Sequence, residues 1–292
     1  MSMKEIVIMS GKGGTGKTSI AAALGVLAGE SAVVADCDVD AANMHLLYQP
    51  EELQSQPFIS GKTAIIDPEL CSGCGICMDK CRFEAITYEE GRYRVDEVDC
   101  EGCSVCYHLC PDSAIKMNDN RAGDWFLSKS RFGNWFVHAR LGIGQENSGK
   151  LVSKVKTESR KLAEAENIPY ILVDGPPGIG CPVISSFSGI SHVLIVTEAT
   201  QAGLHDLKRL VELVHFFKAR ASCVINKSDL NEETAEEIEK FCSEQDIELI
   251  SRIPFLSSFY ETLQQGKTLI EGDDLLITEK LTEIWEYLKN VE

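Results

Sequence analysis

One loop near the start of the chain constrains the fold most strongly. The run from Lys4 to Met9 is apolar and of strand length, and Ser19 to Ala28 favours a helix. A glycine-rich loop between a strand and a helix can close its backbone N–H groups around phosphates. The chain carries this GxxxxGK[ST] motif as Gly11, Lys12, Gly13, Gly14, Thr15, Gly16, Lys17 and Thr18.

Three side chains of this loop bring chemistry to the site. Lys17 supplies positive charge to the outer phosphates, and the Thr18 hydroxyl can ligate Mg²⁺. Lys12 adds a second cation, and the resulting KGGxGK[ST] run resembles the deviant phosphate-binding loop of the MinD/ParA/nitrogenase-iron-protein superfamily. The resemblance implies an ATPase that forms a nucleotide-dependent homodimer, in which Lys12 reaches the partner's phosphates. The alternative for Lys12 is a solvated loop lysine.

Two segments after predicted strands match the switch loops of that superfamily. The strand Ser31 to Ala35 leads into DxDxxxxN, where the resemblance implies that Asp38 orients or activates the attacking water and contacts Mg²⁺ through water. Asp40 is an additional carboxylate that could compete for this role. The strand Tyr170 to Val173 leads into DxPPG, where Asp174 would hold Mg²⁺ through water, and Gly175 and Gly178 would let the loop respond to the γ-phosphate.

The second half of the chain continues a strand–helix alternation. It predicts strands at 192–197, 221–225 and 248–253 and a helix at 204–218. The fold class we expect is therefore α/β: a P-loop NTPase with an open, mostly parallel sheet and helices on both faces. Asn226 begins an NKxD run, a motif that recognises guanine in many GTPases. The resemblance implies instead that Asn226 recognises adenine and that Pro254 lines the base pocket. We therefore expect ATP rather than GTP.

Eight cysteines form two copies of CxxCxxCxxxC at an offset of 29 residues, and the match extends to Ala85/Ala114 and Ile86/Ile115. This is an internal duplication. Zinc fits less well because its sites usually separate two CxxC units by a longer gap. Disulfides fit less well because no signal peptide precedes the chain, so we expect a reducing, cytoplasmic environment. The spacing favours two [4Fe-4S] clusters.

The cysteine block resembles bacterial-type two-cluster ferredoxins, in which the fourth cysteine of each copy reaches the other cluster. The resemblance implies crossed ligand sets. One cluster would be held by Cys71, Cys74, Cys77 and Cys110, and the other by Cys81, Cys100, Cys103 and Cys106. Pro111 follows Cys110 as in that family, whereas Arg82 follows Cys81.

The chain as a whole resembles a group of MinD-superfamily ATPases that carry an inserted ferredoxin domain. We expect a discontinuous MinD-like ATPase domain at 1–60 and 118–292 and an α+β ferredoxin-like domain at 61–117. A length of 292 residues suits one large and one small domain. No apolar stretch approaches 18 residues, and a net charge of −17 argues against general affinity for nucleic acid.

Several features outside these motifs also carry expectations. Cys181 lies seven residues after Asp174, and in the nitrogenase iron protein a cysteine at that distance binds the bridging cluster; here it is a buried switch cysteine, a thiolate near a cluster or a transient metal ligand. The loop from Gly142 to Lys150 is a turn and N-cap before a helix or a contact for a substrate or second subunit. Small core residues are expected at Cys37, Cys223 and Cys242. An apolar stripe of a C-terminal helix, expected to pack on the sheet rather than on a membrane, comprises Leu276, Leu281, Ile284, Trp285 and Leu288.

Three hypotheses follow for function. The first is an ATPase whose hydrolysis is coupled to electron transfer through the two clusters, acting with an unidentified redox partner. The second is a factor that assembles or carries an iron–sulfur or metal cofactor, although four-cysteine ligation of both clusters argues against their donation. The third is a positioning ATPase of the MinD or ParA type whose clusters sense redox state.

Overall fold

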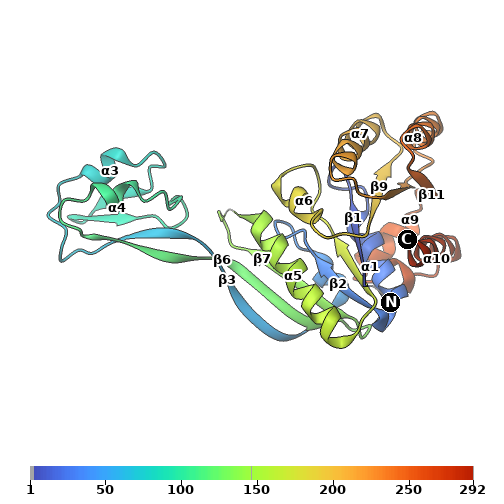
Figure 1. The fold of residues 1–292 in the computed structure, drawn as a ribbon, viewed down its shortest axis with the longest axis horizontal. Helices are drawn as coiled ribbons and strands as arrows, with labels where there is room; N and C mark the ends of the chain where they lie inside the picture. The colour runs from blue at the N-terminus through green and yellow to red at the C-terminus, as the bar shows by residue number, and fades with distance from the viewer. Residues whose placement is uncertain (1–2, 146, 292) are drawn as a thin grey trace. The chain divides into compact units, whose positions relative to one another are not determined.

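The computed structural model describes residues 3–145 and 147–291. These residues form two compact units (Figure 1). Unit 1 comprises Met1–Ser55, Trp125–Arg140 and Ser148–Glu292, and unit 2 comprises Gln56–Asp124 and Leu141–Asn147. The expected insertion at 61–117 falls within the longer segment of unit 2, and its boundaries stay a prediction.

A nine-stranded sheet organises the described part of the chain. All neighbouring pairs from β11 to β7 are parallel, as expected for an open α/β sheet. The six strands predicted from the sequence are present to within one residue, whereas β3, β6 and β7 were not predicted. In spatial order the strands are β11 (Glu248–Ile253), β10 (Ala221–Asn226), β9 (His192–Glu198), β1 (Lys4–Met9), β8 (Tyr170–Asp174), β2 (Ala32–Asp36), β7 (Trp135–Leu141), β6 (Ile115–Lys129) and β3 (Glu51–Ile66).

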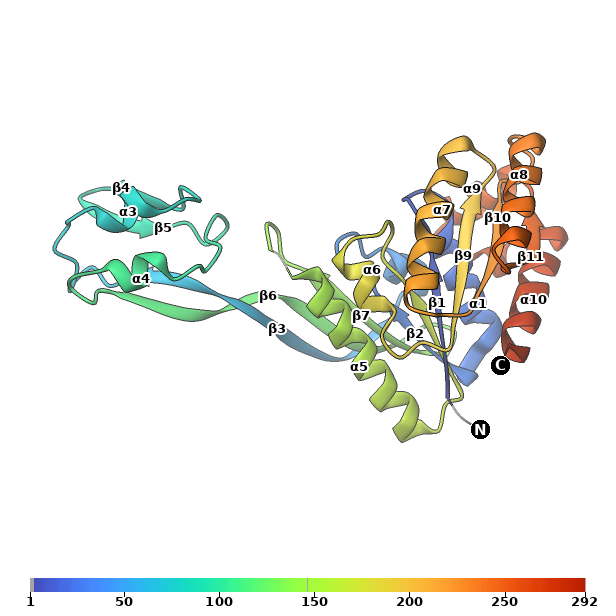
Figure 2. The same ribbon diagram turned by 45° about the horizontal axis from the view of Figure 1, so that its top comes forward.

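Helices cover both faces of this sheet (Figure 2). The central strands are buried on both faces, which explains why they read as continuous apolar runs. One face packs against α1 and α10, with Ile6, Leu194 and Val224 in the shared core. The helices of unit 1 are α1 (Lys17–Ala28), α2 (Met44–Tyr48), α5 (Ser148–Glu166), α6 (Cys181–Ser186), α7 (Gln201–Phe216), α8 (Glu232–Glu244), α9 (Ser257–Gln264) and α10 (Leu275–Asn290).

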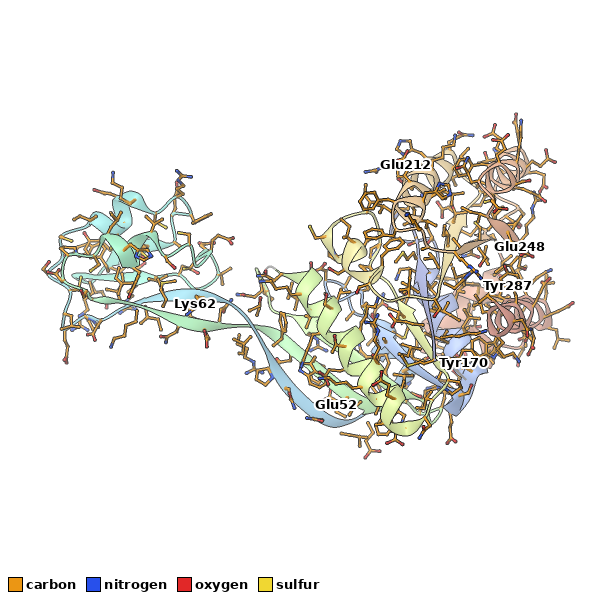
Figure 3. All side chains as sticks on the ribbon, in the orientation of Figure 1. Glu52, Lys62, Tyr170, Glu212, Glu248 and Tyr287 are labelled. Atoms are coloured by element: carbon orange, nitrogen blue, oxygen red, sulfur yellow. The ribbon has the colours of Figure 1, made fainter. Side chains whose placement is uncertain are left out.

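The C-terminal helix packs on the sheet, as expected. Four of its predicted apolar residues, from Leu281 to Leu288, are buried in the same core as α1. Leu276 was predicted to join them but is 41% exposed; Ile277 is buried instead. The Tyr287 hydroxyl donates to Glu248 at the start of β11 over 2.8 Å (Figure 3). Among the described helices, none has the length and apolar character needed to cross a membrane.

A buried ion pair ties β1 to α5. The Lys156 ammonium lies 2.9 Å from Oε1 of Glu5, and both side chains are only 2% exposed. Arg160 binds Oε2 of the same carboxylate at 2.5 Å. Lys156 also donates to the carbonyls of Ser186 and Ser188, so it joins the end of α6 to the central sheet. Burial lowers the pKa of Lys156, and the Glu5 carboxylate opposes that shift.

Unit 2 repeats its backbone geometry as it repeats its sequence. The N–H of Asp67 donates to Ala114 over 2.7 Å, and the N–H of Asp96 donates to Ala85 over 2.7 Å, which are equivalent pairs at the 29-residue offset. Two short helices, α3 (Ile76–Lys80) and α4 (Val105–Leu109), begin at equivalent positions, and the strands β4 (Ile86–Glu89) and β5 (Arg92–Val95) form an antiparallel pair. The duplication is therefore structural as well as sequential.

Candidate functional site

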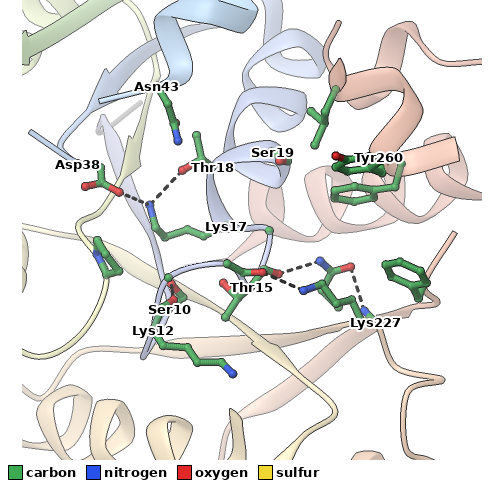
Figure 4. Close-up of a pocket in the computed structure, with 18 of the residues that line it drawn as sticks. Ser10, Lys12, Thr15, Lys17, Thr18, Ser19, Asp38, Asn43, Lys227 and Tyr260 are labelled. Atoms are coloured by element: carbon green, nitrogen blue, oxygen red, sulfur yellow. Dashed lines mark hydrogen bonds and ion pairs between the residues drawn. The ribbon is translucent and has the colours of Figure 1, made fainter. Parts of the chain in front are cut away.

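The glycine-rich loop opens onto a cavity of about 520 Å³ in unit 1 (Figure 4). The loop lies between the end of β1 and the start of α1, as the motif predicts. The walls of the cavity also include residues that follow β2, β8, β10 and β11. These residues lie at the carboxyl ends of parallel strands, where ligands bind in open α/β sheets. Of the residues predicted to bind nucleotide or Mg²⁺, Gly11 and Asp174 do not line the cavity. Those that do are Lys12, Gly13, Gly14, Thr15, Gly16, Lys17, Thr18, Asp38, Asn226 and Pro254.

Two loop positions have no room for a side chain. A Cβ on Gly11 would lie 2.5 Å from the Cβ of Asp206 and 2.8 Å from its backbone, so the loop rests directly on α7. Gly16 has a φ of +90°, and a Cβ there would lie 2.4 Å from Nδ2 of Asn226. These contacts explain why the loop requires glycine at both positions.

The side chains expected to meet phosphate and Mg²⁺ lie together. Lys17 Nζ is 2.6 Å from Oδ1 of Asp174, and the Thr18 hydroxyl donates to Oδ2 of Asp174 over 2.7 Å. Lys17 Nζ is also 3.9 Å from Oδ2 of Asp38. Asp40, the competing carboxylate, is exposed and does not line the cavity. The geometry thus favours Asp38 for the water-activating position.

Backbone hydrogen bonds hold the predicted second switch loop against β1 and the start of the glycine-rich loop. The N–H of Gly175 donates to the carbonyl of Ile8 over 2.9 Å, and the N–H of Gly178 donates to Ser10 over 3.0 Å. A Cβ on Gly175 would lie 2.9 Å from that Ile8 oxygen. The loop therefore lies against the backbone that would surround the phosphates.

Asp36 is a site residue that the sequence argument did not assign. It ends β2 opposite Asp174 in the β2–β8 register and is buried. Burial and the Asp174 carboxylate raise the pKa of Asp36 to about 8, and its Oδ2 has no hydrogen-bond partner. Oxygen donors gathered around Thr18 and Asp174, one of them orphaned, fit a Mg²⁺ ion. The sequence did offer one signal for Asp36, since it is the first aspartate of the DxD motif.

The second lysine of the loop is held by an unpredicted carboxylate. Lys12 Nζ lies 2.6 Å from Oε1 of Glu198, the last residue of β9. The same carboxylate binds Lys227 Nζ through Oε2 at 3.0 Å. Lys227 also donates to the Gly14 carbonyl over 2.9 Å. Glu198 therefore connects the phosphate loop to the NKxD segment.

The far end of the cavity has an apolar and aromatic wall. Phe255, Phe259 and Tyr260 line it beside Pro254, and the aromatic residues were not predicted. Asn226 donates from Nδ2 to the Thr15 carbonyl over 2.8 Å, which joins this end to the phosphate loop. A planar base would fit against such a wall.

The eight duplicated cysteines separate into two groups in unit 2. Each group lines its own small cavity, and each cavity contains three cysteines of one copy and the fourth cysteine of the other. The first is lined by Cys71, Cys74, Cys77 and Cys110, and the second by Cys81, Cys100, Cys103 and Cys106. All eight are free thiols.

Among the described residues, no group of three or more His, Cys, Asp or Glu side chains could hold a metal ion. That observation concerns ligands gathered around one ion. The thiolates of a cubane cluster bind different irons, so they surround a larger volume. The donor chemistry and the four-and-four division therefore fit clusters rather than single ions.

The remaining cysteines differ in their surroundings. Cys37, Cys223 and Cys242 are buried, as expected for small core residues. Cys181 begins α6 and is exposed, so the interpretation of a buried switch cysteine was wrong. Its alternatives as a thiolate near a cluster or a transient metal ligand stay predictions.

The loop before α5 is shorter than expected. The helix begins at Ser148 rather than near Leu151, because the chain turns at Asn147, which has a φ of +77°. Residue 146, within the predicted loop, lies outside the described residues. A role of this loop in substrate or subunit contact stays a prediction.

Comparisons with known proteins agree with this geometry. A family model described as the CobQ/CobB/MinD/ParA nucleotide binding domain matches residues 6–270. An uncharacterised protein of Methanocaldococcus jannaschii is 31% identical over 287 residues, covering 98% of this chain and 96% of its own. Among solved structures, the septum site-determining protein MinD complexed with Mg-ADP from Pyrococcus horikoshii has a TM-score of 0.60 at 17% identity, covering 99% and 96% of the two chains. The McdA–ATP complex of Cyanothece has a TM-score of 0.57 at 16% identity, covering 100% and 97%. At these identities the structural likeness shows a shared fold.

Proposed function

The chain belongs to the CobQ/CobB/MinD/ParA nucleotide-binding family, and on this premise we propose that it is a Mg²⁺-dependent ATPase with two [4Fe-4S] clusters. Hydrolysis takes place in a nucleotide-sandwich homodimer and is coupled to electron transfer through the clusters. One observation carries the proposal: the same chain has a phosphate-loop cavity and two cavities that are each lined by four cysteines.

At the end of the cavity formed by the glycine-rich loop, each residue has a separate role in hydrolysis. Bound Mg²⁺ neutralises charge on the outer phosphate oxygens. Lys17, which rests on Asp174 in this structure, is within reach of the phosphates that the loop encloses. Thr18 and Asp174, whose side chains are hydrogen-bonded to each other, would hold the ion, and Asp38, 3.9 Å from the Lys17 ammonium, would orient the attacking water. Because these groups are preorganised, they stabilise charge that develops during transfer.

The base end of the cavity supports ATP over GTP. Asp229 completes the NKxD run, but its Oδ1 accepts the backbone N–H of Phe255 over 2.6 Å. This contact ties Asp229 to the 254–256 loop, and Asp229 is not among the residues that line the cavity, where a guanine base would have to meet it. The aromatic wall is suited to adenine, which needs few polar partners.

Asp229→Ala tests this assignment. We expect it to weaken ATP and GTP binding by a similar factor, because its role is to hold the loop, and to leave the preference for ATP unchanged. Dissociation constants for both nucleotides, measured by calorimetry on the wild-type protein and the variant, provide the check. A selective loss of GTP affinity would instead show that Asp229 contacts the base.

The cysteine cavities support the cluster assignment. Cys71, Cys74 and Cys77 with Cys110 are suited to one cluster, and the second set is suited to the other. When bound, each cluster supplies one-electron redox chemistry. The thiolates would hold the irons, and the buried apolar residues Ile86 and Ile115 belong to one core cluster with cysteines of both sets.

Iron content tests the crossed sets directly. Protein isolated without oxygen should hold about eight irons per chain, four from each cubane. The double variant Cys71→Ala/Cys110→Ala should retain about four irons, because both cysteines belong to one cluster. Cys71→Ala/Cys81→Ala should lose both clusters. Uncrossed sets would reverse these two results, and Cys223→Ala, at a buried thiol outside the cavities, is the matched control.

Coupling between the two activities has its own measurement. The EPR spectrum or potential of the reduced clusters should change when Mg-ATP is added. Clusters that are indifferent to nucleotide would contradict redox coupling. Transfer of iron–sulfur to an apo-acceptor would then favour the carrier hypothesis, and nucleotide-independent spectra without transfer would favour a MinD-like positioning ATPase.

A further inference from the structure

Lys12 is held away from the chemistry expected of it. It belongs to the phosphate loop, yet its ammonium is directed away from Lys17 and Asp38, toward the end of β9 (Figure 4). There it forms a 2.6 Å ion pair with Glu198, whose side chain is only 10% exposed. The Lys12 side chain itself is 33% exposed, so the pair is partly buried, and it restricts the side chain more than a fully exposed ion pair does.

The surroundings of Glu198 allow Lys12 to leave. Glu198 binds a second cation, Lys227, at 3.0 Å through its other oxygen. Lys227 is anchored to the Gly14 carbonyl independently of Lys12. If Lys12 departs, the carboxylate keeps a charged partner, so no buried charge is left unpaired. Glu198 therefore pairs with two lysines, and one of them, Lys12, can leave while the other stays bound.

The electrostatics agree with this geometry. Burial alone would raise the pKa of Glu198, but the hydrogen bonds from Lys12 and Lys227 outweigh burial and hold that pKa below its usual value. The carboxylate is therefore charged at neutral pH and attracts Lys12 in the nucleotide-free chain. A bound triphosphate carries more negative charge and can compete for the same ammonium.

We propose that Glu198 is a positioning residue that holds Lys12 in reserve until nucleotide phosphates displace it. The inference rests on the proposed ATPase function. Glu198 touches neither the phosphates nor the attacking water; it acts through Lys12 and sets the nucleotide concentration at which that lysine becomes available. After Lys12 has moved to the phosphates, Lys227 remains paired with the Glu198 carboxylate.

Glu198→Gln is the direct test, because it removes the charge and preserves the shape. We expect the ATP concentration for half-maximal hydrolysis to fall about tenfold. The reason is that the nucleotide phosphates no longer compete with a charged Glu198 for the Lys12 ammonium. The maximal rate should change little. Glu198→Asp, which keeps the charge, should behave like the wild-type protein, and Glu244→Gln, at an exposed ion pair on α8, is a neutral control.

A double-mutant cycle separates this role from a structural one. In the wild-type background Glu198→Gln should lower the dissociation constant of ATP, measured by calorimetry, whereas in a Lys12→Met background it should leave that constant unchanged, because there is no lysine to release. Binding is measured here because the test must not depend on hydrolysis by a chain that lacks Lys12. Lys227→Gln should raise the ATP concentration for half-maximal hydrolysis in the otherwise wild-type chain, because Lys12 then becomes the only lysine that pairs with Glu198 among the described residues, beside a hydrogen bond from the hydroxyl of Thr200. An unshifted Glu198→Gln protein, or a shift that persists without Lys12, would overturn the inference. Absence of ATP hydrolysis in the wild-type protein would instead contradict the proposed function.

Discussion

Lys17→Ala is expected to lower the rate of ATP hydrolysis by at least about 100-fold, the effect of removing a preorganised charge from a reacting centre. The side chain is 4% exposed and lies within ion-pair distance of both Asp174 and Asp38. No other lysine on the described part of the cavity contacts these two carboxylates through an ion pair. Steady-state phosphate release measures the effect.

The iron content of the same variant should remain unchanged, because the cysteine cavities are lined by unit 2 residues alone. Lys17→Arg is a control for misfolding, because it keeps a positive charge beside the carboxylates. It should still lose hydrolysis, because the larger planar guanidinium cannot reproduce the ammonium geometry. Lys161→Ala, at an exposed lysine of α5, is the control. Joint loss of hydrolysis and iron would show that the two units fold as one.

Glu5→Leu is expected to lower the free energy of unfolding by about 3–5 kcal/mol, the usual effect of removing one partner from a buried ion pair. It would leave the Lys156 ammonium, which is 2% exposed, without its carboxylate. The carbonyls of Ser186 and Ser188 would remain as its described hydrogen-bond partners. Denaturant titration followed by circular dichroism gives the measurement.

The chain contains a matched control on the same helix. Glu158 also binds two cations, Lys154 and Lys161, each at 2.9 Å, but this group is more exposed: Glu158 is 17% exposed, Lys154 36% and Lys161 64%. Glu158→Leu should therefore change stability by no more than about 1 kcal/mol. The double variant Glu5→Leu/Lys156→Met should recover much of the lost stability, because apolar groups replace both charges. Equal effects of Glu5→Leu and Glu158→Leu would contradict a special role for burial.

The sequence predicted the parts of the fold that depend on local pattern. The strands before Ser10, Cys37 and Gly175 are short apolar runs that end in a functional loop, so their type and position could be read directly. By contrast, β3 is long and largely exposed, and β6 mixes exposed, half-buried and buried residues, so neither strand has a continuous apolar signal. Their strand geometry comes from pairing along the edge of the sheet, which no local pattern records.

The candidate site divides in the same way. Lys17, Thr18 and Asp174 belong to motifs whose spacing reflects their chemistry, so the sequence named them before the structure brought them together. Glu198 and Phe259 belong to no motif. Phe259 lines the cavity from α9, and Glu198, at the end of β9, is connected to the cavity through Lys12 and Lys227. Both placements depend on which strands and helices lie side by side.

By itself, the sequence determined the nucleotide-binding fold, because glycine spacing and apolar runs act locally. The division of the cysteines was implied by the resemblance of the cysteine block to two-cluster ferredoxins. The tertiary structure decided which charges meet. It paired Lys12 with Glu198, buried Lys156 against Glu5 and exposed Cys181. These outcomes join residues far apart in the chain, and the energy of a charge depends on burial and on its partners, which exist only in the folded molecule.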